Sequence, residues 1–450
     1  MRKYFGTDGV RGKANIFPMT AEFALKLGMA AAKVFKNGSK KHKIVIGKDT
    51  RISGYMFENA IVSGICSMGV DAIIVGVLPT PAIAFITRSL RADAGVVISA
   101  SHNPYYDNGI KFFSSEGYKL PDDLEFKLEQ LLDEDLECAS SEDVGKAYRI
   151  ETAIGRYVEY AKASFDKRYD LKGLKIVLDC ANGAAYKVAP MAISELGADV
   201  VVINDRPSGK NINENCGAVY PEQLCQTVKD VKADVGISFD GDADRVIFCD
   251  ENGELVDGDF ILGICAKDMK SEGILNKNTL VATVMSNIGF ENSLKREGIN
   301  VVRSQVGDRY VLEEMLKGGF NLGGEQSGHI IFSDYNTTGD GLISALQLLK
   351  ILVKTGRPLS ELKSFISLYP QVLKNVEVPY KRPLDEMKET VKKIKSIEEK
   401  LEGQGRIFVR YSGTENKLRV MAEGEDEKII TAYCDEVIQI ALDEIKESTK

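Results

Sequence analysis

Strand-like and helix-like patterns alternate along most of the chain. Two segments, 68–75 and 196–203, each place a glycine after a helix-like stretch and before a run of branched apolar residues. That order is typical of a helix that ends at a C-cap glycine and is followed by a buried strand. A weaker copy lies at 297–303. The helices that precede the three glycines are expected at 57–68, 188–196 and 287–297.

A second strand-like run follows each copy of this pattern, at 92–99, 233–239 and 319–324. Alternating strands and helices favour parallel sheets that are covered by helices on both faces. The sequence therefore predicts an α/β protein in which three similar α/β domains with mixed, mostly parallel sheets extend to residue 368.

The pattern changes after Pro370 and Pro379. A charged helix, two strands and a final helix are expected at 384–401, 405–411, 417–422 and 429–445. We interpret this tail as a compact α+β domain, so that the predicted domains around a central cleft are 1–155, 156–256, 257–368 and 369–450. The acidic segment 122–142 has apolar residues at helical spacing and is interpreted as a surface helix.

The composition limits which binding partners and which cellular compartment are expected. The 450 residues are 44% hydrophobic and 28% charged, which is typical of a soluble multidomain protein. A net charge of −8 argues against nucleic acid or an anionic membrane as the main partner. The opening residues lack the apolar stretch of a signal peptide, and the apolar region 72–86 is interrupted by prolines and too short to span a bilayer. Eight scattered cysteines fit reduced thiols, and we expect a cytoplasmic protein.

The segment 240–245, Asp-Gly-Asp-Ala-Asp-Arg, follows the predicted strand 233–239. Asp240, Asp242 and Asp244 repel one another unless a cation gathers them, and carboxylates favour a hard divalent ion such as Mg²⁺. In an extended chain the first and last of them would lie roughly 13 Å apart, too far for one ion. We therefore expect the segment to curl at the end of the strand. The alternative is an acidic surface turn.

Ser101 lies between the strand 92–99 and Pro104, where the chain must turn. One interpretation is a hydroxyl that only caps this turn. The other is a nucleophile or phosphoryl carrier, whose phosphate would complete a Mg²⁺ shell with the three aspartates. His102 also raises the alternative of a Ser-His-Asp hydrolase. Against it, neighbouring residues on a strand point apart, and the Gly-x-Ser-x-Gly motif is missing.

Two cations are expected in the same cleft. Lys111 lies in a strand-like run after the Ser101 turn, and alone it would be interpreted as a solvated lysine at a strand edge. Close to a metal and to arginines its pKa is expected to be lowered, which would suit acid–base catalysis. Arg11 lies in the glycine-rich loop 6–12 and is expected to contact an anion.

Two further loops carry polar side chains suited to a sugar phosphate. Glu325, Ser327 and His329 offer a carboxylate, a hydroxyl and an imidazole, a mixture that suits sugar hydroxyls. In the tail a phosphate-binding set is expected, because a glycine lets backbone N–H groups converge and guanidinium groups bind phosphate through two hydrogen bonds. Its members are Arg410, Ser412, Gly413, Thr414 and Arg419. A polar hairpin turn is the alternative. No Walker motif occurs, so nucleotide hydrolysis is not expected.

Taken in order, the motifs resemble the α-D-phosphohexomutase family over essentially the whole chain. The matching segments are 4–12, 98–104, 239–245, 324–329 and 410–415. The resemblance implies four domains around a cleft, a phosphoserine at Ser101, one Mg²⁺ held by Ser101 and the three aspartates, and sugar recognition by the third-domain loop. The segments 4–8 and 325–329 resemble the glucosamine branch of the family. Asn416 replaces the usual proline, which would loosen the phosphate loop without removing a donor.

The implied reaction is the reversible conversion of glucosamine 6-phosphate to glucosamine 1-phosphate, through glucosamine 1,6-bisphosphate. It would feed amino-sugar nucleotide and cell-wall precursor synthesis. The resemblance implies catalytic roles for Ser101, His102, Lys111, Arg11 and Arg245. The expected partner is a small-molecule sugar phosphate, with no nucleic acid or membrane, and the protein is expected to be a monomer or a homodimer.

Three alternatives stay open on the sequence. A metal-dependent sugar phosphatase would use Ser101 as a nucleophile and release phosphate to water. A sugar-phosphate sensor would bind without chemistry. Within the mutases, the third-domain loop alone leaves a phosphoglucomutase or phosphomannomutase preference open.

Overall fold

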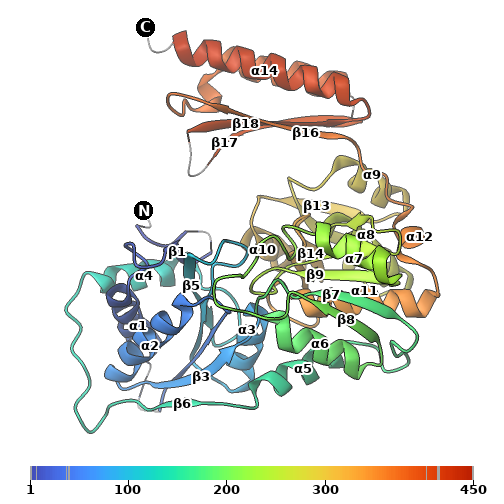
Figure 1. Ribbon diagram of the computed structural model, residues 1–450. Helices are drawn as coiled ribbons and strands as arrows, with labels where there is room; N and C mark the ends of the chain where they lie inside the picture. The colour runs from blue at the N-terminus through green and yellow to red at the C-terminus, as the bar shows by residue number, and fades with distance from the viewer. Residues whose placement is uncertain are drawn as a thin grey trace. The chain divides into compact units, whose positions relative to one another are not determined.

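The computed structural model describes residues 3–6, 8–36, 38, 41–401, 403–412 and 416–447. The chain divides into two compact units, residues 1–285 with 301–363 and residues 286–300 with 364–450. The α/β sheets and the C-terminal antiparallel sheet are shown in Figure 1. The predicted fold class, three similar α/β domains and a C-terminal α+β domain, is confirmed.

The first sheet has the strand order β1-β5-β4-β2-β3-β6. Its strands β4, β2, β3 and β6 are parallel, and one edge is extended by β5, which is antiparallel to β4, and by β1, which is antiparallel to β5. Alternate residues of β2 face different helices: Ile44 and Ile46 join the core with α1 and α2, and Gly47 lies against Ile83 of α3 on the other face. The elements are β1 Val10–Lys13, α1 Ala21–Phe35, β2 Lys43–Lys48, α2 Ser53–Ser67, β3 Asp71–Val77, α3 Thr80–Ser89, β4 Ala94–Ile98, β5 Asp107–Ser114, α4 Asp122–Leu132 and β6 Ala147–Arg149.

The second and third sheets repeat this architecture. The second has the order β11-β10-β9-β7-β8, in which β9, β7 and β8 are parallel, β10 is antiparallel to β9, and β11 is antiparallel to β10. Its elements are α5 Ala153–Ala163, β7 Lys175–Asp179, α6 Ala185–Glu195, β8 Asp199–Ile203, α7 Glu222–Val231, β9 Val235–Phe239, β10 Val246–Asp250 and β11 Leu255–Val256.

The third sheet has the order β13-β12-β14-β15, in which β14 is parallel to β12 and antiparallel to β15. Its elements are α8 Gly258–Ser271, the 3₁₀ turn η1 Asn276–Asn278, β12 Thr279–Thr283, β13 Asn300–Ser304, α10 Asp308–Gly318, β14 Leu322–Gly324, β15 Ile330–Phe332, α11 Gly341–Thr355 and α12 Leu359–Lys363.

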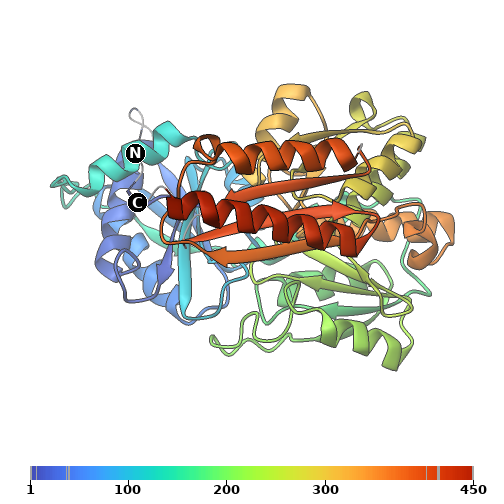
Figure 2. The ribbon, with the colours of Figure 1, turned by 90° about the horizontal axis from the view of Figure 1, so that it is seen from above.

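The second unit is built on an antiparallel sheet with the order β16-β18-β17. Two helices, α13 and α14, lie side by side over one face of this sheet (Figure 2). Leu418, Val420 and Ala422 of β18 pack there against Cys434 and Val437 of α14. The elements are α9 Ile288–Arg296, β16 Gln371–Glu377, the 3₁₀ turn η2 Leu384–Glu386, α13 Lys388–Leu401, β17 Gly405–Tyr411, β18 Lys417–Gly424 and α14 Glu427–Glu447.

Two parts of the predicted pattern differ from the structure. The helix expected at 122–142 ends at Leu132, and the next residues, Asp133 to Asp135, are acidic. Negative charge at a helix C-terminus opposes the helix dipole, which favours an end at this point. The strand β16 was not predicted. Val372 and Val376 pack against the core of the second unit while the strand alternates in exposure, so a period of two was present as a signal.

No helix among the described residues combines the length and the apolar character that a membrane span requires.

Candidate active site

Three loops that follow strands of three different sheets converge in the first unit. The Ser101 turn follows β4, the aspartate segment 240–244 follows β9, and residues 325–329 follow β14. Ligands of open α/β sheets bind at such carboxyl ends of strands. The loops border a cavity of about 430 Å³. Its lining includes Asp8, Arg11, Ser101, His102, Lys119, Asp244, Arg245, Asp308, Glu325 and His329.

Ser101 meets the aspartate segment, as the sequence predicts. Its Oγ donates a hydrogen bond to Asp240 Oδ2 at 2.6 Å, and His102 Nδ1 lies 3.4 Å from the same Oγ. The expectation that Ser101 and His102 point apart is wrong, because Ser101 lies in a turn with a φ of 50° and not on a strand. Burial, Arg245 and Arg11 lower the pKa of His102 to about 4, so its imidazole is neutral at pH 7.

The three aspartates form a buried cluster in which one carboxylate oxygen of each lies within 4.8 Å of the others. The segment curls as predicted, and Ala243 has a φ of 55°. Asp242 Oδ1 and Asp244 Oδ1 are buried and have no hydrogen-bond partner in the part of the chain that the structure describes. Burial, Asp244 and Asp242 raise the pKa of Asp240 well above its ordinary value. Unpartnered oxygens and mutual repulsion are what a bound divalent cation would relieve, so the cluster could hold a metal.

Lys111 projects from β5 into this cluster. Its Nζ lies 2.9 Å from Asp242 Oδ2 and 2.9 Å from Asp8 Oδ2, and its side chain is buried. Burial lowers the pKa of Lys111, but Asp242 and Asp8 outweigh it, and the net shift is upward. The expected lowering of the pKa is therefore wrong, and so is the alternative of a solvated lysine. Carboxylates, rather than cations, dominate the surroundings of this ammonium group.

Arg11 and Arg245 flank the Ser101 turn. Arg11 pairs with Asp8, and its Nη1 lies 3.5 Å from the carbonyl oxygen of Ala100. The backbone N–H of Arg245 donates to Asp240 Oδ1 at 3.2 Å. Burial opposes the charge of Arg245, but Asp244 and Asp240 raise its pKa. Two guanidinium groups therefore line the cavity beside the hydroxyl.

Glu325 and Ser327 occupy the third loop. Glu325 Oε1 accepts a hydrogen bond from the backbone N–H of Gly307 at 2.9 Å. Ser327 is exposed, and its Oγ lies 3.4 Å from Glu325 Oε2. Glu325 lines the cavity together with His329 of the same loop.

His329 is buried and joins the third loop to the aspartate cluster. Its Nδ1 lies 3.7 Å from Asp244 Oδ2, and its Nε2 lies 3.5 Å from Asp308 Oδ2. Burial lowers the pKa of His329, but Asp244 and Asp308 raise it to about 9. His329, which is predicted to bind the sugar, thus also contacts Asp244 of the second α/β domain from its own place in the third.

The sequence interpretation missed three charged residues of the cavity. Lys119 Nζ lies 2.5 Å from Asp8 Oδ1 and also pairs with Asp308. Asp8 lies in the glycine-rich loop 6–12, three residues before Arg11, and this closeness in the sequence could have indicated that Asp8 belongs to the site. Lys119 and Asp308 are single charged residues in distant segments, and nothing local in the sequence distinguishes them from surface charges.

The predicted phosphate-binding residues lie in the second unit. Arg410 of β17 and Arg419 of β18 are cross-strand partners, and Arg419 Nη2 lies 3.5 Å from Ser412 Oγ. Burial and Arg419 lower the pKa of Arg410. Like charges on opposite strand positions are unfavourable, and an anion between them would relieve the repulsion. Gly413 and Thr414 lie outside the described residues.

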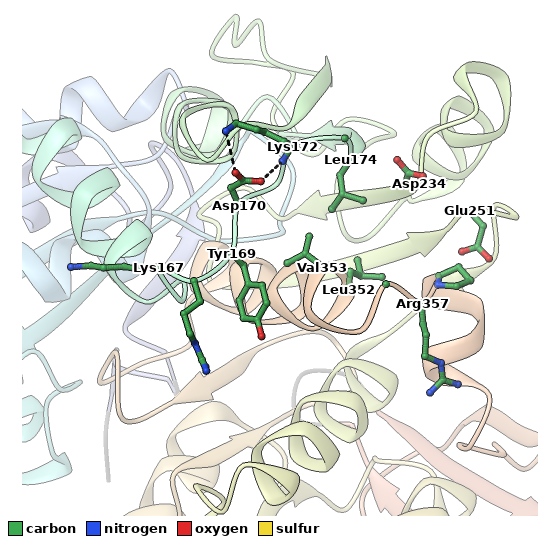
Figure 3. A pocket seen from close by; sticks show the side chains of 14 residues that line it. Lys167, Tyr169, Asp170, Lys172, Leu174, Asp234, Glu251, Leu352, Val353 and Arg357 are labelled. Carbon is green, nitrogen blue, oxygen red and sulfur yellow. Dashed lines mark hydrogen bonds and ion pairs between the residues drawn. The ribbon is translucent and has the colours of Figure 1, made fainter.

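A larger cavity, of about 850 Å³, lies away from this chemistry (Figure 3). It is bordered by residues that precede β7 and β9 in the second sheet, by Glu251 after β10, and by residues 352–358 at the end of α11. Lys172 pairs with Asp170 at 3.2 Å, and Arg357 pairs with Glu361 at 2.8 Å. Lys172 and Arg357 are therefore each compensated by a neighbouring carboxylate.

Comparison with known proteins places all parts of the chain in one family. Four models of phosphoglucomutase/phosphomannomutase domains match in order: α/β/α domain I at residues 2–138, domain II at 155–253, domain III at 257–369 and the C-terminal domain at 373–440. Among solved structures, a phosphoglucomutase/phosphomannomutase family protein from Burkholderia thailandensis has a TM-score of 0.80 at 23% identity, and each chain is covered over 96%. An Aspergillus fumigatus N-acetylphosphoglucosamine mutase, solved with GlcNAc-6P and magnesium, has a TM-score of 0.68 at 20% identity over 98% of this chain and 96% of its own.

Curated relatives are much closer in sequence. Phosphoglucosamine mutases of Citrifermentans bemidjiense and Geobacter metallireducens are each 58% identical over 443 residues, which are 98% of this chain and 98% of theirs. The chain belongs to the phosphoglucomutase/phosphomannomutase family, the α-D-phosphohexomutases, and is an isomerase that acts as an intramolecular phosphotransferase.

Proposed function

We propose that the protein interconverts glucosamine 6-phosphate and glucosamine 1-phosphate, with Ser101 as the phosphoryl carrier and glucosamine 1,6-bisphosphate as the intermediate. The observation that carries this proposal is the hydrogen bond between Ser101 Oγ and Asp240 Oδ2, 2.6 Å long, at a cavity lined by Arg11 and Arg245. A hydroxyl that only capped its own turn would not need a cluster of carboxylates from another domain.

The reaction consists of two transfers with opposite directions. In the first, the bond between phosphorus and Ser101 Oγ breaks, a bond to the free sugar hydroxyl forms, and the hydroxyl proton ends on Ser101 Oγ. In the second, the other phosphate of the bisphosphate returns to Ser101, and the proton returns to the sugar oxygen. Arg11 and Arg245 would offset charge on the transferring group.

The metal proposed for this site is Mg²⁺, held by Asp240, Asp242, Asp244 and an oxygen of phosphorylated Ser101. When bound, it would withdraw charge from the phosphoryl group. Carboxylate oxygens suit this hard cation, and the two unpartnered oxygens of Asp242 and Asp244 support its placement.

Sugar recognition is assigned to Glu325, Ser327 and His329, and the phosphate that does not react is assigned to Arg410, Ser412, Gly413, Thr414 and Arg419. The amino sugar is favoured over glucose and mannose because the relatives at 58% identity are phosphoglucosamine mutases. A sugar phosphatase would use the same hydroxyl and metal, so the two functions are separated by their products.

The test supplies glucosamine 6-phosphate, glucose 6-phosphate and mannose 6-phosphate in parallel, and measures sugar 1-phosphate, free phosphate and the intact mass of the protein. The proposal expects glucosamine 1-phosphate with the highest kcat/KM, and a mass increase of one phosphoryl group that maps to Ser101. Free phosphate without sugar 1-phosphate would establish a phosphatase. Binding without phosphate on Ser101 would establish a sensor.

Lys111→Met is expected to lower kcat by about 10²- to 10³-fold with little change in KM, because a residue that assists proton movement and charge compensation acts mainly in the transition state. The raised pKa indicates that Lys111 is an ammonium group, and the role proposed for it is to donate to a phosphoryl or sugar oxygen of the bound substrate. Steady-state kinetics measures this effect. Lys48→Met is the matched control, since Lys48 is also buried in the first sheet but pairs with Glu58. Near-normal turnover in Lys111→Met would remove Lys111 from the mechanism.

Arg419→Ala is expected to raise KM by about 10- to 100-fold and to leave kcat within about threefold, because a hydrogen bond to a charged phosphate contributes about 1.5–3 kcal/mol to binding. Kinetics with glucosamine 6-phosphate at several ionic strengths measures it. Lys428→Ala removes the same charge from an exposed position of α14 and serves as the control. An unchanged KM in Arg419→Ala would contradict the assignment of the phosphate loop.

A further inference from the structure

The turn that carries Ser101 depends on contacts from outside itself. It connects β4 to β5 without regular secondary structure, and Ser101 has a φ of 50°. A residue other than glycine in this left-handed region is strained unless its surroundings hold it there. This backbone conformation sets the direction of the Cα–Cβ bond from which Oγ projects toward Asp240, so whatever holds the turn also positions the hydroxyl.

Arg51 supplies most of the contacts to this turn. It lies between β2 and α2, and its side chain is fully buried, with 0% exposed. Its Nη2 donates to the carbonyl oxygens of Ser101 and Asn103, both at 2.8 Å. Its Nη1 donates to the carbonyl oxygens of Asp107, at 3.2 Å, and Pro104. One guanidinium group therefore binds four carbonyls between residues 101 and 107.

Asp49 holds both Arg51 and the opposite side of the turn. Its Oδ2 accepts hydrogen bonds from Arg51 Nε at 2.8 Å and from Ser99 Oγ at 2.6 Å. Ser99 Oγ in turn accepts from the backbone N–H of Ser101 at 2.9 Å. The N–H and the C=O of Ser101 are thus both bound within one buried network that begins at the end of β2.

The second domain contributes to the same carbonyls. Asn213 Nδ2 donates to the carbonyl oxygen of Ser101 at 2.9 Å and to that of Asn103 at 3.2 Å. Each of these oxygens therefore accepts from both Arg51 and Asn213. The turn is fixed from two domains, while the hydroxyl stays directed at the aspartate cluster.

We propose that Arg51 is a positioning residue for phosphoryl transfer, which keeps Ser101 Oγ aligned with the aspartate cluster through its bonds to the turn. The proposal rests on the function proposed above for Ser101. Arg51 acts through Ser101 and not on the substrate, because the cavity lining contains Ser101 and His102 but not Arg51 among the described residues. A planar guanidinium can bind several carbonyls at fixed angles, whereas the single ammonium of a lysine cannot.

The test is the rate at which Ser101 takes a phosphoryl group from glucosamine 1,6-bisphosphate, measured by intact mass in wild type, Arg51→Lys and Ser99→Ala. In this step the bond from phosphorus to the sugar oxygen breaks, the bond to Ser101 Oγ forms, and the serine proton ends on the sugar oxygen. The expected rate is lower by about 10²-fold in Arg51→Lys, because misplacement of a reacting group by about 1 Å costs that much. Ser99→Ala removes the two hydrogen bonds of Ser99 Oγ, one to Asp49 and one from the N–H of Ser101, and leaves the Arg51 side chain intact. It is expected to be about tenfold slower.

Other readouts separate positioning from a loss of stability. KM for glucosamine 6-phosphate and the rise in melting temperature on adding Mg²⁺ are expected to stay near their wild-type values in both variants. Gln347→Leu is the control for stability, since it removes a buried hydrogen bond to the carbonyl oxygen of Ser164 far along the chain from the turn. Should Arg51→Lys fail to fold, Ser99→Ala decides alone.

The outcomes distinguish this proposal from the function on which it rests. Wild-type protein that never gains a phosphoryl group at Ser101 would overturn both. Wild-type protein that gains it, together with variants that gain it at the same rate, would overturn the role of Arg51 only. Slow transfer together with an equal loss of the rise in melting temperature on adding Mg²⁺ would show that the whole site is disordered. That result would also overturn the positioning role of Arg51.

Discussion

Replacing Ser101 by alanine is expected to abolish the interconversion of glucosamine 6-phosphate and glucosamine 1-phosphate, with kcat lower by at least about 10⁴-fold. The loss should be this large because no other group can take over the role of the carrier. The bond that must form in each half of the reaction ends on Ser101 Oγ, and a methyl group offers no oxygen.

The same variant should keep its substrate binding and its fold. Ser101→Ala removes one hydrogen bond to Asp240 but leaves the backbone contacts of the turn intact. Its intact mass should show no phosphoryl group, and glucosamine 6-phosphate should still raise its melting temperature. Ser115→Ala changes an exposed serine of the same domain and should behave as wild type. Turnover retained in Ser101→Ala above about 1% of wild type would place the carrier elsewhere.

The parts of the site that could be predicted from the sequence have their chemistry in one contiguous segment. Asp240, Asp242 and Asp244 are such a case, because their spacing alone indicates that the carboxylates repel one another and that the segment must curl for them to share one ion. The convergence of three loops could also be predicted, since repeated strand–helix units place the carboxyl ends of their strands at equivalent positions. The C-terminal strand 405–411 was predicted with the bounds of β17.

The rest depends on distances between segments. Lys119 contacts Asp8 and Asp308, which lie 111 and 189 positions away, and no periodicity connects them. The direction of the Lys111 pKa shift required a count of the carboxylates around its Nζ, which only the structure supplies. The relation of Ser101 to His102 was predicted wrongly because a left-handed residue cannot be recognised when it is not glycine.

Removal of divalent cations is expected to lower kcat by about 10³-fold or more, since charge on the transferring phosphoryl group would lose several kcal/mol of stabilisation. Chelation followed by titration with Mg²⁺ measures it. Binding should also be visible without turnover. A cation at about 100 times its Kd stabilises the folded protein by about 2.7 kcal/mol, so Mg²⁺ should raise Tm by at least about 2 °C. Full activity after exhaustive chelation would contradict a metal at the aspartate cluster.

Two charge-removing variants should separate a metal site from a structural acidic cluster, because both should lose the stabilisation by Mg²⁺ although their effects on the metal-free protein have opposite signs. The pKa of Asp240 is raised by burial, Asp244 and Asp242, so its ionised form is disfavoured in the folded protein, and Asp240→Asn should make the metal-free protein equally or more stable at pH 7. Burial raises the pKa of Asp242, but Lys111 lowers it by more, and the net shift is downward. The ionised form of Asp242 is therefore favoured in the folded protein, and Asp242→Asn should lower Tm. Both variants should lose turnover and the rise in Tm with Mg²⁺. If Asp240→Asn kept that rise unchanged, the ion would have to bind at another place in the protein.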